Sequence, residues 1–528
     1  MKQSKWLFGI SGSFFGLFIL FVIIEAFLRL FTPPSQSWAH IVEFMLPNMI
    51  ESTLILTITT GMLTAIIGFT LAYFVTVFDF WGRKWMQLLL FIPLAIPPYI
   101  LTYTLSSMFS YTGIVQTFFR NTLQLSLPGT FFHLPPMPLA IYVFVSTLFP
   151  YVYITSLGFL KRMLGNYVET ALTMQKSYGQ IFKDIALPLS MPAILAGVLL
   201  VVLEVIGDFG VVMYLNIPAF STSIFRSWVS LGDFDSALRL SAVMMGFVFL
   251  FLMVVGFFKK KTGRILPSKP RTLKRKKLTG LQGVAMSTLF ITILTLFLVI
   301  PVLQLLFWSW ASYANIRWTM FINALVTTLI SSVLISGLIV VIALLISTDH
   351  RIFSNLRTSI LTKISILGYS IPGSVVAMLV LFFFIQISSW LKFPLHTSMS
   401  MLVVGLVIRY LGLGIQNIAG GYRKIGTRYH EAAQTLGKSY LKAWVTVDIP
   451  LLLPALLSGF ALVFIDVIKE LPLTLNLRPF NYHTLATQVY QYASDEQVVE
   501  AAIPSLVIIL LSALLIWLIT YPMMKEDV

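Results

Sequence analysis

The sequence contains no cysteine, and only 11% of its residues are charged. The absence of thiols excludes disulfide bridges and cysteine-ligated metal centres. Six histidines are scattered without the spacing of metal ligands, so no metalloenzyme centre is indicated. Apolar residues dominate instead. They make up 58% of the 528 residues, with a mean hydropathy of +0.89, whereas an ordinary soluble domain is about 45 to 50% apolar. The chain is therefore predicted to be an integral membrane protein.

Acidic residues are also scarce, which leaves a net charge of +16 from 36 Lys and Arg against 20 Asp and Glu. The basic residues gather in short segments beside long apolar runs, and residues 259–277 hold ten of them and no acid. Short basic loops of membrane proteins stay on the cytoplasmic side. The charge therefore predicts topology and contact with a lipid bilayer, and no nucleic-acid surface.

A membrane-crossing helix needs about 20 apolar residues, and such runs recur along the whole chain. Six spans in each half would keep Lys2, the basic linker and Lys525 all on the cytoplasmic side. The first run ends at Arg29 without a small-residue cleavage site, so it is predicted to be a retained helix and not a signal peptide. The predicted spans lie near residues 7–31, 53–77, 86–110, 138–160, 187–210, 236–258, 284–310, 323–347, 360–387, 398–420, 450–468 and 500–522.

An internal repeat relates the two halves at an offset of 262 residues. Residues 167–197 align without gaps on residues 429–459, with 13 of 31 positions identical, where composition alone predicts roughly two or three. We therefore predict a first half at 1–258, a basic cytoplasmic linker at 259–283 and a second half at 284–528. Both halves begin on the same side, so the repeats are parallel and related by an axis along the membrane normal.

The repeated segments lie in the loop between the fourth and fifth span of each half, at residues 161–187 and 423–449. They resemble the permeases of bacterial ATP-binding-cassette importers, which carry E-A-A, three residues, G, about nine residues and I-x-L-P in this loop. The second copy matches with Glu431, Ala432, Ala433 and Gly437, followed by Val447, Ile449 and Pro450. The first copy reads Glu169, Thr170, Ala171 and then Gln175 in place of glycine, followed by Ile185, Leu187 and Pro188.

This resemblance implies an all-α membrane protein with the type I importer permease fold, in the bacterial plasma (inner) membrane. It implies that each loop holds a short coupling helix, which docks onto one of two copies of a separate ATPase subunit. Glycine would let the chain turn sharply after that helix, and the proline would start the next membrane helix. The other interpretation is an ordinary amphipathic loop that was duplicated with the rest, and Gln175 leaves open whether both loops couple equally.

Gly437, Lys438 and Ser439 look like the end of a phosphate-binding loop, but Ala432 stands where its first glycine is required and no strand precedes it. We therefore expect no cofactor on this chain and no enzyme activity, with ATP and Mg²⁺ used by the partner subunit.

The segment from Asp466 to Ala502 resembles that of ferric-iron permeases, with K-E-L-P, R-P-F and T-L-A in succession, and the segment from Glu204 resembles theirs too. The resemblance implies ferric iron as solute, delivered by an extracytoplasmic iron-binding protein. Permeases for thiamine, phosphonate, sulfate or polyamine share the loop motif and remain alternatives, and a secondary transporter is a further one.

Two pairs of carboxylates stand four residues apart and so share a helix face, one pair in each half. They are Glu204 with Asp208, and Asp466 with Glu470. Ionisable groups near a membrane interior usually face a pathway or a partner, and oxygen ligands suit hard cations such as ferric iron. We therefore predict a pathway or gate there, with transient contacts to the metal. The alternatives are helix ends neutralised by Lys469 and water, or a docking surface for the binding protein. Arg409 is a further buried-charge candidate.

Overall fold

The fold is described by a computed structural model that covers residues 2–125, 128–261, 273–353 and 355–521. Residues 262–272 of the predicted linker and Lys525 lie outside this description. In chain order the helices are α1 (Lys2–Leu28), α2 (Gln36–His40), α3 (Leu46–Val77), α4 (Arg83–Leu89), α5 (Pro98–Met108), α6 (Ile114–Thr117), α7 (Pro136–Thr173), α8 (Tyr178–Ile181), α9 (Leu187–Gly207), α10 (Gly210–Tyr214), α11 (Phe220–Val229), α12 (Phe234–Lys261), α13 (Gly280–Leu294), α14 (Ile300–Ser312), α15 (Trp318–Ile352), α16 (Leu356–Leu367), α17 (Gly373–Leu391), α18 (Met399–Ile425), α19 (Arg428–Thr435), α20 (Tyr440–Ala443), α21 (Ile449–Ile468), α22 (Pro472–Leu477), α23 (Leu485–Ser494) and α24 (Ala502–Thr520).

The predicted all-α membrane architecture is confirmed. Within the described residues, 11 helices are long and apolar enough to cross a membrane, or up to 12 when one bent pair is counted as a single span. Helices are the solution that the sequence favours because a bilayer offers no water to the backbone, and a helix satisfies every N–H and C=O within its own segment.

The third predicted span of each half is broken. In the first half, Arg83–Ala95 and Pro98–Met108 meet at an angle of 89°. In the second half, α16 ends at Leu367 and α17 begins at Gly373 after a 3₁₀ turn. Pro97 and Pro372 precede the outgoing helices with ψ of 134° and 144°. The continuous spans predicted at 86–110 and 360–387 were therefore wrong in detail, because a proline preceded by an extended residue interrupts a helix.

Four π-helical segments also depend on prolines. They are Ile41–Met45, Phe182–Ala186, Thr295–Val299 and Trp444–Asp448, and each ends two residues before a proline. A proline within a helix provides no N–H to the carbonyl four residues earlier and crowds that carbonyl, and a wider π turn relieves both effects. Pro188 and Pro450 lie in the first turn of α9 and α21 as predicted. However, the helical path already starts at Tyr178 and Tyr440.

The chain forms two compact units, each assembled from both halves of the sequence. Unit 1 contains Met1–Val42, Ser223–Met245 and Arg317–Gln488, and unit 2 contains Glu43–Thr222, Gly246–Ile316 and Val489–Val528. In unit 1, α1 packs against α15 and α16, which belong to the second half of the sequence. In unit 2, α14 packs against α24 and α5. Each unit thus receives the first membrane helix of the opposite repeat, so the units interleave the sequence halves 1–258 and 284–528.

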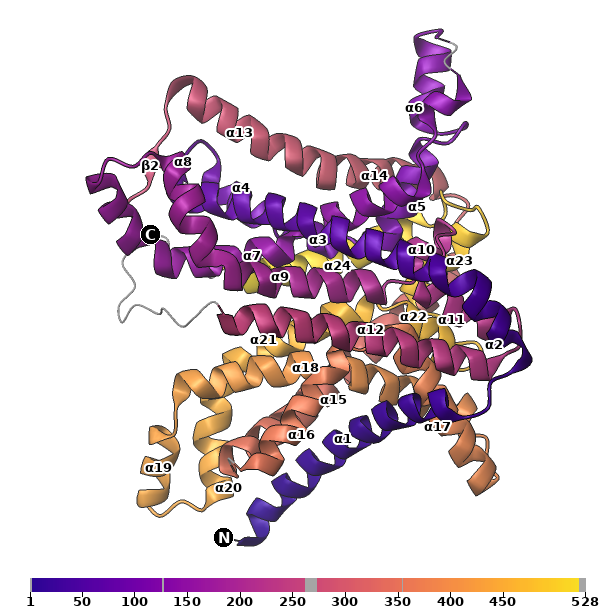
Figure 1. Ribbon diagram of the computed structural model, residues 1–528, viewed down its shortest axis with the longest axis vertical. Coiled ribbons are helices and arrows are strands. Elements are labelled where there is room, and N and C mark those ends of the chain that lie inside the picture. Colours follow the sequence, from indigo (N-terminus) through magenta and orange to yellow (C-terminus); the bar gives the residue numbers. More distant parts are fainter. Residues whose placement is uncertain (1, 126–127, 262–272, 354, 522–528) are drawn as a thin grey trace. The chain divides into compact units, whose positions relative to one another are not determined.

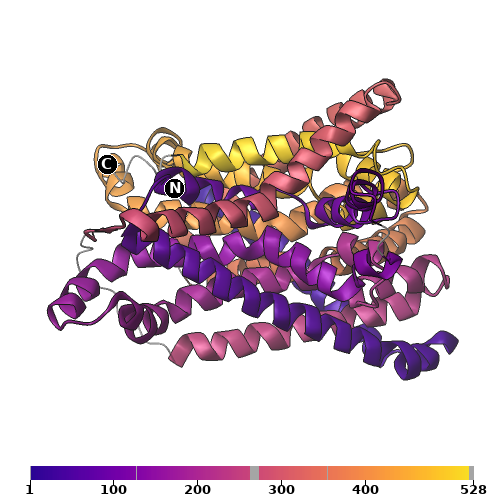
Figure 2. The same cartoon turned by 90° about the horizontal axis from the view of Figure 1, so that it is seen from above.

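The centre of each unit is a set of long helices that run side by side (Figures 1 and 2). In unit 2, α3 packs along α7 and α9, and in unit 1, α18 packs along α15 and α21. Two short parallel strands add the described end of the linker to unit 2. β1 (Phe78–Asp79) pairs with β2 (Lys276–Lys277).

Candidate functional site

The loops that carry the repeated motif, residues 161–187 and 423–449, are called the first and second motif loops. Both contain the same turn between two helices. In the first loop, Gln175 N–H donates to the carbonyl of Leu172 (3.0 Å) and Lys176 N–H to that of Ala171 (3.0 Å). In the second, Gly437 N–H donates to Gln434 (2.9 Å) and Lys438 N–H to Ala433 (3.1 Å). This pair of bonds is the Schellman motif, which satisfies the last carbonyls of a helix.

The turn requires a left-handed residue at the motif's glycine position. Gly437 has φ +84°, and Gln175 at the equivalent position has φ +59°. The expected sharp turn is therefore present in both loops, although only the second has the residue that adopts this conformation without steric cost.

The next helix begins in the same way in both loops, with a serine as N-cap. Ser177 accepts from Gln180 N–H (3.3 Å), and Ser439 accepts from Lys442 N–H (3.4 Å). These bonds satisfy donors that every helix start leaves open. Gly437, Lys438 and Ser439 are thus a helix end, a turn and a helix cap, which accounts for the resemblance to a phosphate-binding loop.

The two loops differ at the start of the helix that leads into the turn. In the second, α18 stops at Ile425, Gly426 takes φ +68°, and α19 follows as a separate short helix. In the first, Leu164 stands at the equivalent position and α7 continues unbroken to Thr173. A short, separate helix was expected in both loops, and this expectation holds only for the second. Leucine favours continuation of a helix, whereas glycine readily adopts a positive φ.

The motif residues divide into buried and exposed ones. Ala171 and Ala433, at equivalent positions, are buried, while Glu431 and Ala432 are exposed and Glu169 is half-buried. The sequence analysis missed the most exposed apolar side chains of these loops, Met174 at 70% and Leu436 at 84%. Each directly precedes the left-handed residue of its loop, so the two side chains are exposed at equivalent places of the repeat. Their equivalence across the repeat was the signal available in the sequence.

The carboxylate pair of the first half lies at the end of α9, in unit 2. Asp208 accepts a hydrogen bond from the backbone N–H of Val211 (2.8 Å), at the start of α10. Ser221 donates to the backbone carbonyl of Asp208 (2.6 Å). Glu204, one turn earlier, is half-buried like Asp208. Asp208 therefore stabilises the start of the next helix.

The pair of the second half lies at the end of α21, in unit 1, and repeats this arrangement. Glu470 accepts from the backbone N–H of Leu473 (2.9 Å), at the start of α22. Glu470 is only 6% exposed, and its other oxygen accepts from Tyr410 and lies 3.9 Å from Arg409 Nε. Asp466 pairs with Lys469 at 3.0 Å. These contacts agree with the alternative in which Lys469 neutralises one acid, and they give Asp208 and Glu470 the same local role.

Arg409 is a buried charge with two kinds of partner. It is 7% exposed on α18, pairs with Glu470, and donates from Nη1 to the carbonyl of Ile371 (2.6 Å), just before α17. A buried charge is tolerated when it is both paired and hydrogen-bonded. Arg409 therefore joins the break before α17 to the acidic end of α21.

In the part of the chain that the structure describes, metal-ligating side chains do not gather in threes. No group of three or more His, Asp or Glu that could hold a metal ion is found among the described residues. The two carboxylate pairs belong to different units, and each offers oxygen atoms from two acids at most. Such oxygens can cap helices, pair with basic groups and make brief contacts with a hard cation, but within one unit they do not form a closed coordination shell.

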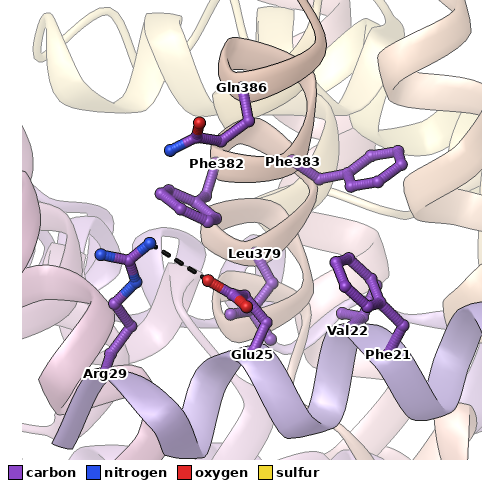
Figure 3. Close-up of a pocket in the computed structure, with 8 residues that line it drawn as sticks. All are labelled: Phe21, Val22, Glu25, Arg29, Leu379, Phe382, Phe383 and Gln386. Atoms are coloured by element: carbon purple, nitrogen blue, oxygen red, sulfur yellow. Dashed lines mark hydrogen bonds and ion pairs between the residues drawn. The ribbon is translucent and has the colours of Figure 1, made fainter. Parts of the chain in front are cut away.

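A cavity of about 280 Å³ lies in unit 1 between α1 and α17, outside every predicted site (Figure 3). Arg29 pairs with Glu25 at 3.1 Å, and its guanidinium lies 4.2 Å from the centre of the Phe382 ring. Phe383 packs against Phe21, with ring centres 5.9 Å apart. These contacts hold the first helix of the chain on a helix of the second half.

Two sets of membrane helices, each with the same Schellman turn and serine cap between its fourth and fifth spans, define a membrane protein built by duplication. Comparison with known families agrees. The family described as "Binding-protein-dependent transport system inner membrane component" matches residues 58–261 and 339–521. The matches cover more than half of the chain, which therefore belongs to this family of ABC importer permeases. Members of the family work with a solute-binding protein and an ATPase.

Individual relatives carry different solutes. The chain is 24% identical to the Fe(3+)-transport system permease protein FbpB 2 of Haemophilus influenzae, over 89% of both chains. It is 27% identical to the sulfate transport system permease protein CysT of Salmonella typhimurium, over 47% of this chain and 91% of that protein. A shorter match, 36% identical over 17% of this chain and 32% of the relative, is to the maltose/maltodextrin permease MalG of Photorhabdus laumondii.

Proposed function

We propose that this permease moves ferric iron across the bacterial plasma membrane, after delivery by an extracytoplasmic iron-binding protein. The observation that carries the proposal is the match to an Fe(3+) permease over 89% of both chains, which includes both six-helix halves. The sulfate permease matches 47% of this chain, about one half of the duplication. Shared organisation over the full length supports iron over sulfate, while thiamine, phosphonate and polyamine have no comparable support.

ATP is hydrolysed by a partner, and two copies of that ATPase dock on the two motif loops. Each loop offers a strongly exposed apolar side chain, Met174 or Leu436, beside its turn. The pairing of a rigid Schellman turn with an exposed apolar anchor suits a loop that enters a partner's cleft and transmits force. Glu169, Gln175, Glu431, Ala432 and Gly437 lie on these loops, and the buried Ala171 and Ala433 hold them against the permease. ATP and Mg²⁺ belong to the ATPase.

The motif loops, the basic linker and both termini lie in the cytoplasm. The distribution of Lys and Arg supports this orientation, because short basic loops stay on the cytoplasmic side. Lys276 and Lys277, at the described end of the linker, pair with β1. This end of the linker therefore lies on the same side of the membrane as the loop between α3 and α4. Glu204, Asp208, Asp466 and Glu470 then lie towards the outer face.

The four acids act in a gate, with transient contacts to the ion made by the half-buried ones. Asp208 and Glu470 cap α10 and α22, so changes at the ends of α9 and α21 are passed directly to these short helices. Glu204, Asp208 and Asp466 are half-buried and suited to brief contact with a passing cation. Tight binding of iron resides in the binding protein.

The test of the solute is uptake of radioactive ferric iron by cells with and without this gene, competed with unlabelled thiamine, phosphonate and sulfate. We expect gene-dependent uptake that none of the three suppresses. Unchanged iron uptake in a deletion strain that has no redundant system would refute iron and leave the importer class in place.

The docking proposal is tested separately. Glu431→Lys or Gly437→Asp should abolish uptake while the permease remains inserted and abundant, as measured by immunoblot of membranes. Normal uptake in either variant would count against the docking assignment. Neutralising Asp208 and Glu470 together should lower uptake without weakening capture of the binding protein, and loss of capture would reassign these residues to docking.

A further inference from the structure

The second motif loop is attached to unit 1 through a buried acid that the sequence analysis did not select. Asp448 is 1% exposed, and its Oδ2 lies 2.7 Å from His430 Nδ1 and 3.3 Å from Arg351 Nη1. A carboxylate beside an arginine accepts hydrogen bonds only, so the His430 proton lies on Nδ1 and is donated to Asp448. Asp448 thereby joins α19, which carries the motif, to the end of α15.

Arg351 extends this attachment to the start of the loop. Its Nη2 donates to the carbonyl of Gly426 (2.6 Å), the residue that separates α18 from α19, and its guanidinium lies 4.5 Å from the centre of the Tyr422 ring. Trp444 adds a second link, since its Nε1 donates to Thr348 Oγ1 and to the phenolic hydroxyl of Tyr422, at 3.2 Å each. The loop is thus held at both ends by polar contacts to α15 and α18.

The first half holds its loop by different chemistry at equivalent positions. Val168 replaces His430 and Ala186 replaces Asp448, and these two residues are 1% and 0% exposed. Phe182 replaces Trp444 and packs against the rings of Phe69 and Tyr73, with centres 5.3 and 5.0 Å away. The Tyr73 hydroxyl also donates to the carbonyl of Tyr178 in the first motif loop (2.9 Å). The positions that hold His430 and Asp448 in the second half are thus apolar in the first, with no buried ion pair at that place among the described residues.

The difference has a mechanical consequence. Apolar packing is non-directional and tolerates small shifts, because its free energy depends on the area removed from water. A buried carboxylate is stable only while its partners stay in place, since the alternative is an uncompensated charge in the interior. The second motif loop should therefore either move with α15 as one body or separate from it completely, and partly separated conformations should be little populated.

We propose that Asp448 is a positioning residue which, with His430 and Arg351, locks the second motif loop to α15, whereas apolar packing takes the place of this ion pair in the first loop. The proposal rests on the proposed docking of an ATPase to these loops. It makes the second loop the more firmly attached of the two transmission elements, although its glycine turn and separate helix give its backbone more freedom.

The position of the loop can be measured without any ATPase. Because the chain has no cysteine, Leu436→Cys and Leu356→Cys can carry spin labels without background, and both side chains are exposed and belong to unit 1. Double electron–electron resonance on the full-length permease in lipid nanodiscs should give one narrow distance. Asp448→Ala should raise the population at other distances at least about tenfold, because it leaves Arg351 and His430 without their buried acceptor.

The rescue variant copies the other half of the protein. His430→Val with Asp448→Ala reproduces the pair Val168 and Ala186. It should return the population at other distances to within about threefold of the wild type, because it removes the unpaired His430. Arg351 keeps its bond to the carbonyl of Gly426 and is partly exposed to solvent. Asp235→Asn, which alters an ion pair with Arg239 elsewhere in unit 1, should leave the distance unchanged. If Asp448→Ala does not insert, Asp448→Asn provides a milder test with the same direction.

The lock would be overturned if the distance distribution in Asp448→Ala were as narrow as that of the wild type. Asp448→Asn is judged in the same way when the alanine variant does not insert. Failure of the double variant to recover the narrow distribution would overturn the contrast between the halves. In unlabelled permease purified with its ATPase, the lock also predicts fewer ions transported per ATP hydrolysed in Asp448→Ala, with recovery in the double variant. A wild-type complex that shows no coupled hydrolysis would refute the docking proposal, while the spin-label result would still decide the lock.

Discussion

The left-handed residue is glycine in the second motif loop and glutamine in the first, so each can be replaced by the other. The free-energy cost of Gly437→Gln can be worked out from its backbone conformation. Gly437 has φ +84°, and a Cβ added there would meet nothing within 4 Å. Gly437→Gln therefore introduces no clash. It adds roughly 1–2 kcal/mol of left-handed strain and regains about 0.5–1 kcal/mol because glycine loses more entropy on folding. The net cost is about 1 kcal/mol, which corresponds to about a fivefold change in local opening.

The assay is hydrogen exchange of the Lys438 amide, which donates to Ala433 across the turn, in permease reconstituted into nanodiscs. Gly437→Gln should speed this exchange about fivefold. Gln175→Gly in the first loop should slow exchange of the equivalent Lys176 amide by up to about the same factor, because it removes the strain at φ +59°.

The control is Gly179→Ala, which lies four residues after Gln175, has no positive φ, and also meets nothing within 4 Å. It should not speed exchange, since alanine is the better helix former. Unchanged exchange at Lys438 in Gly437→Gln would refute the reasoning, because it would mean that the turn relaxes out of the left-handed region without loss of its hydrogen bonds.

Three further predictions concern stability and docking. Glu470→Ala should lower the free energy of unfolding by about 3 kcal/mol, because Tyr410, Arg409 and Leu473 N–H lose a buried acceptor. Asp466→Ala removes a partly exposed pair with Lys469 and should lower it by about 1 kcal/mol or less. Thermal unfolding in detergent compares the two variants, and equal losses would refute the distinction. Asp233→Ala should cost about 1 kcal/mol as a lost helix cap. Burial raises the Asp233 pKa, but hydrogen bonds from Ser236, Ser35 and Ser37 lower it by more than burial raises it, so that the pKa lies below its ordinary 3.8. The Asp233 contribution is therefore fully present above pH 3.8 and is lost as the pH falls through the lower folded pKa; a difference between variant and wild type that grew in acid would contradict this sign. Leu436→Glu should weaken copurification of the ATPase at least about tenfold with normal insertion, and unchanged copurification would exclude Leu436 as an anchor.

The helical fold and most spans could be predicted from the sequence, because a bilayer demands long apolar helices and the hydropathy of a segment depends on its own residues. The same holds for the motif turn. Ala433, Gly437 and Ser439 follow local rules for helix ends and caps, which need no distant partner. Gln175 showed the limit of these rules, since an unfavourable residue adopts the same turn when the surrounding helices require it.

The candidate carboxylates were predictable as a set but not in their contacts. Their spacing placed each pair on one helix face, and Lys469 was a visible neighbour of Asp466. Glu470 depends on Tyr410 and Arg409, which are 60 and 61 positions away along the chain. Such partners depend on how helices pack, and nothing in a local pattern selects them.

The sequence by itself determined the membrane class, the duplication, the position of the two motif loops and the family resemblance, because each depends on composition or on residues close together in the chain. Only the tertiary structure decided that the first helix of each repeat packs in the unit of the other, that Asp208 and Glu470 cap short helices, and that Asp448 joins His430 to Arg351. These features arise when buried surface and buried charge find partners far away in the sequence. Two halves with nearly the same motif thereby hold it in different ways.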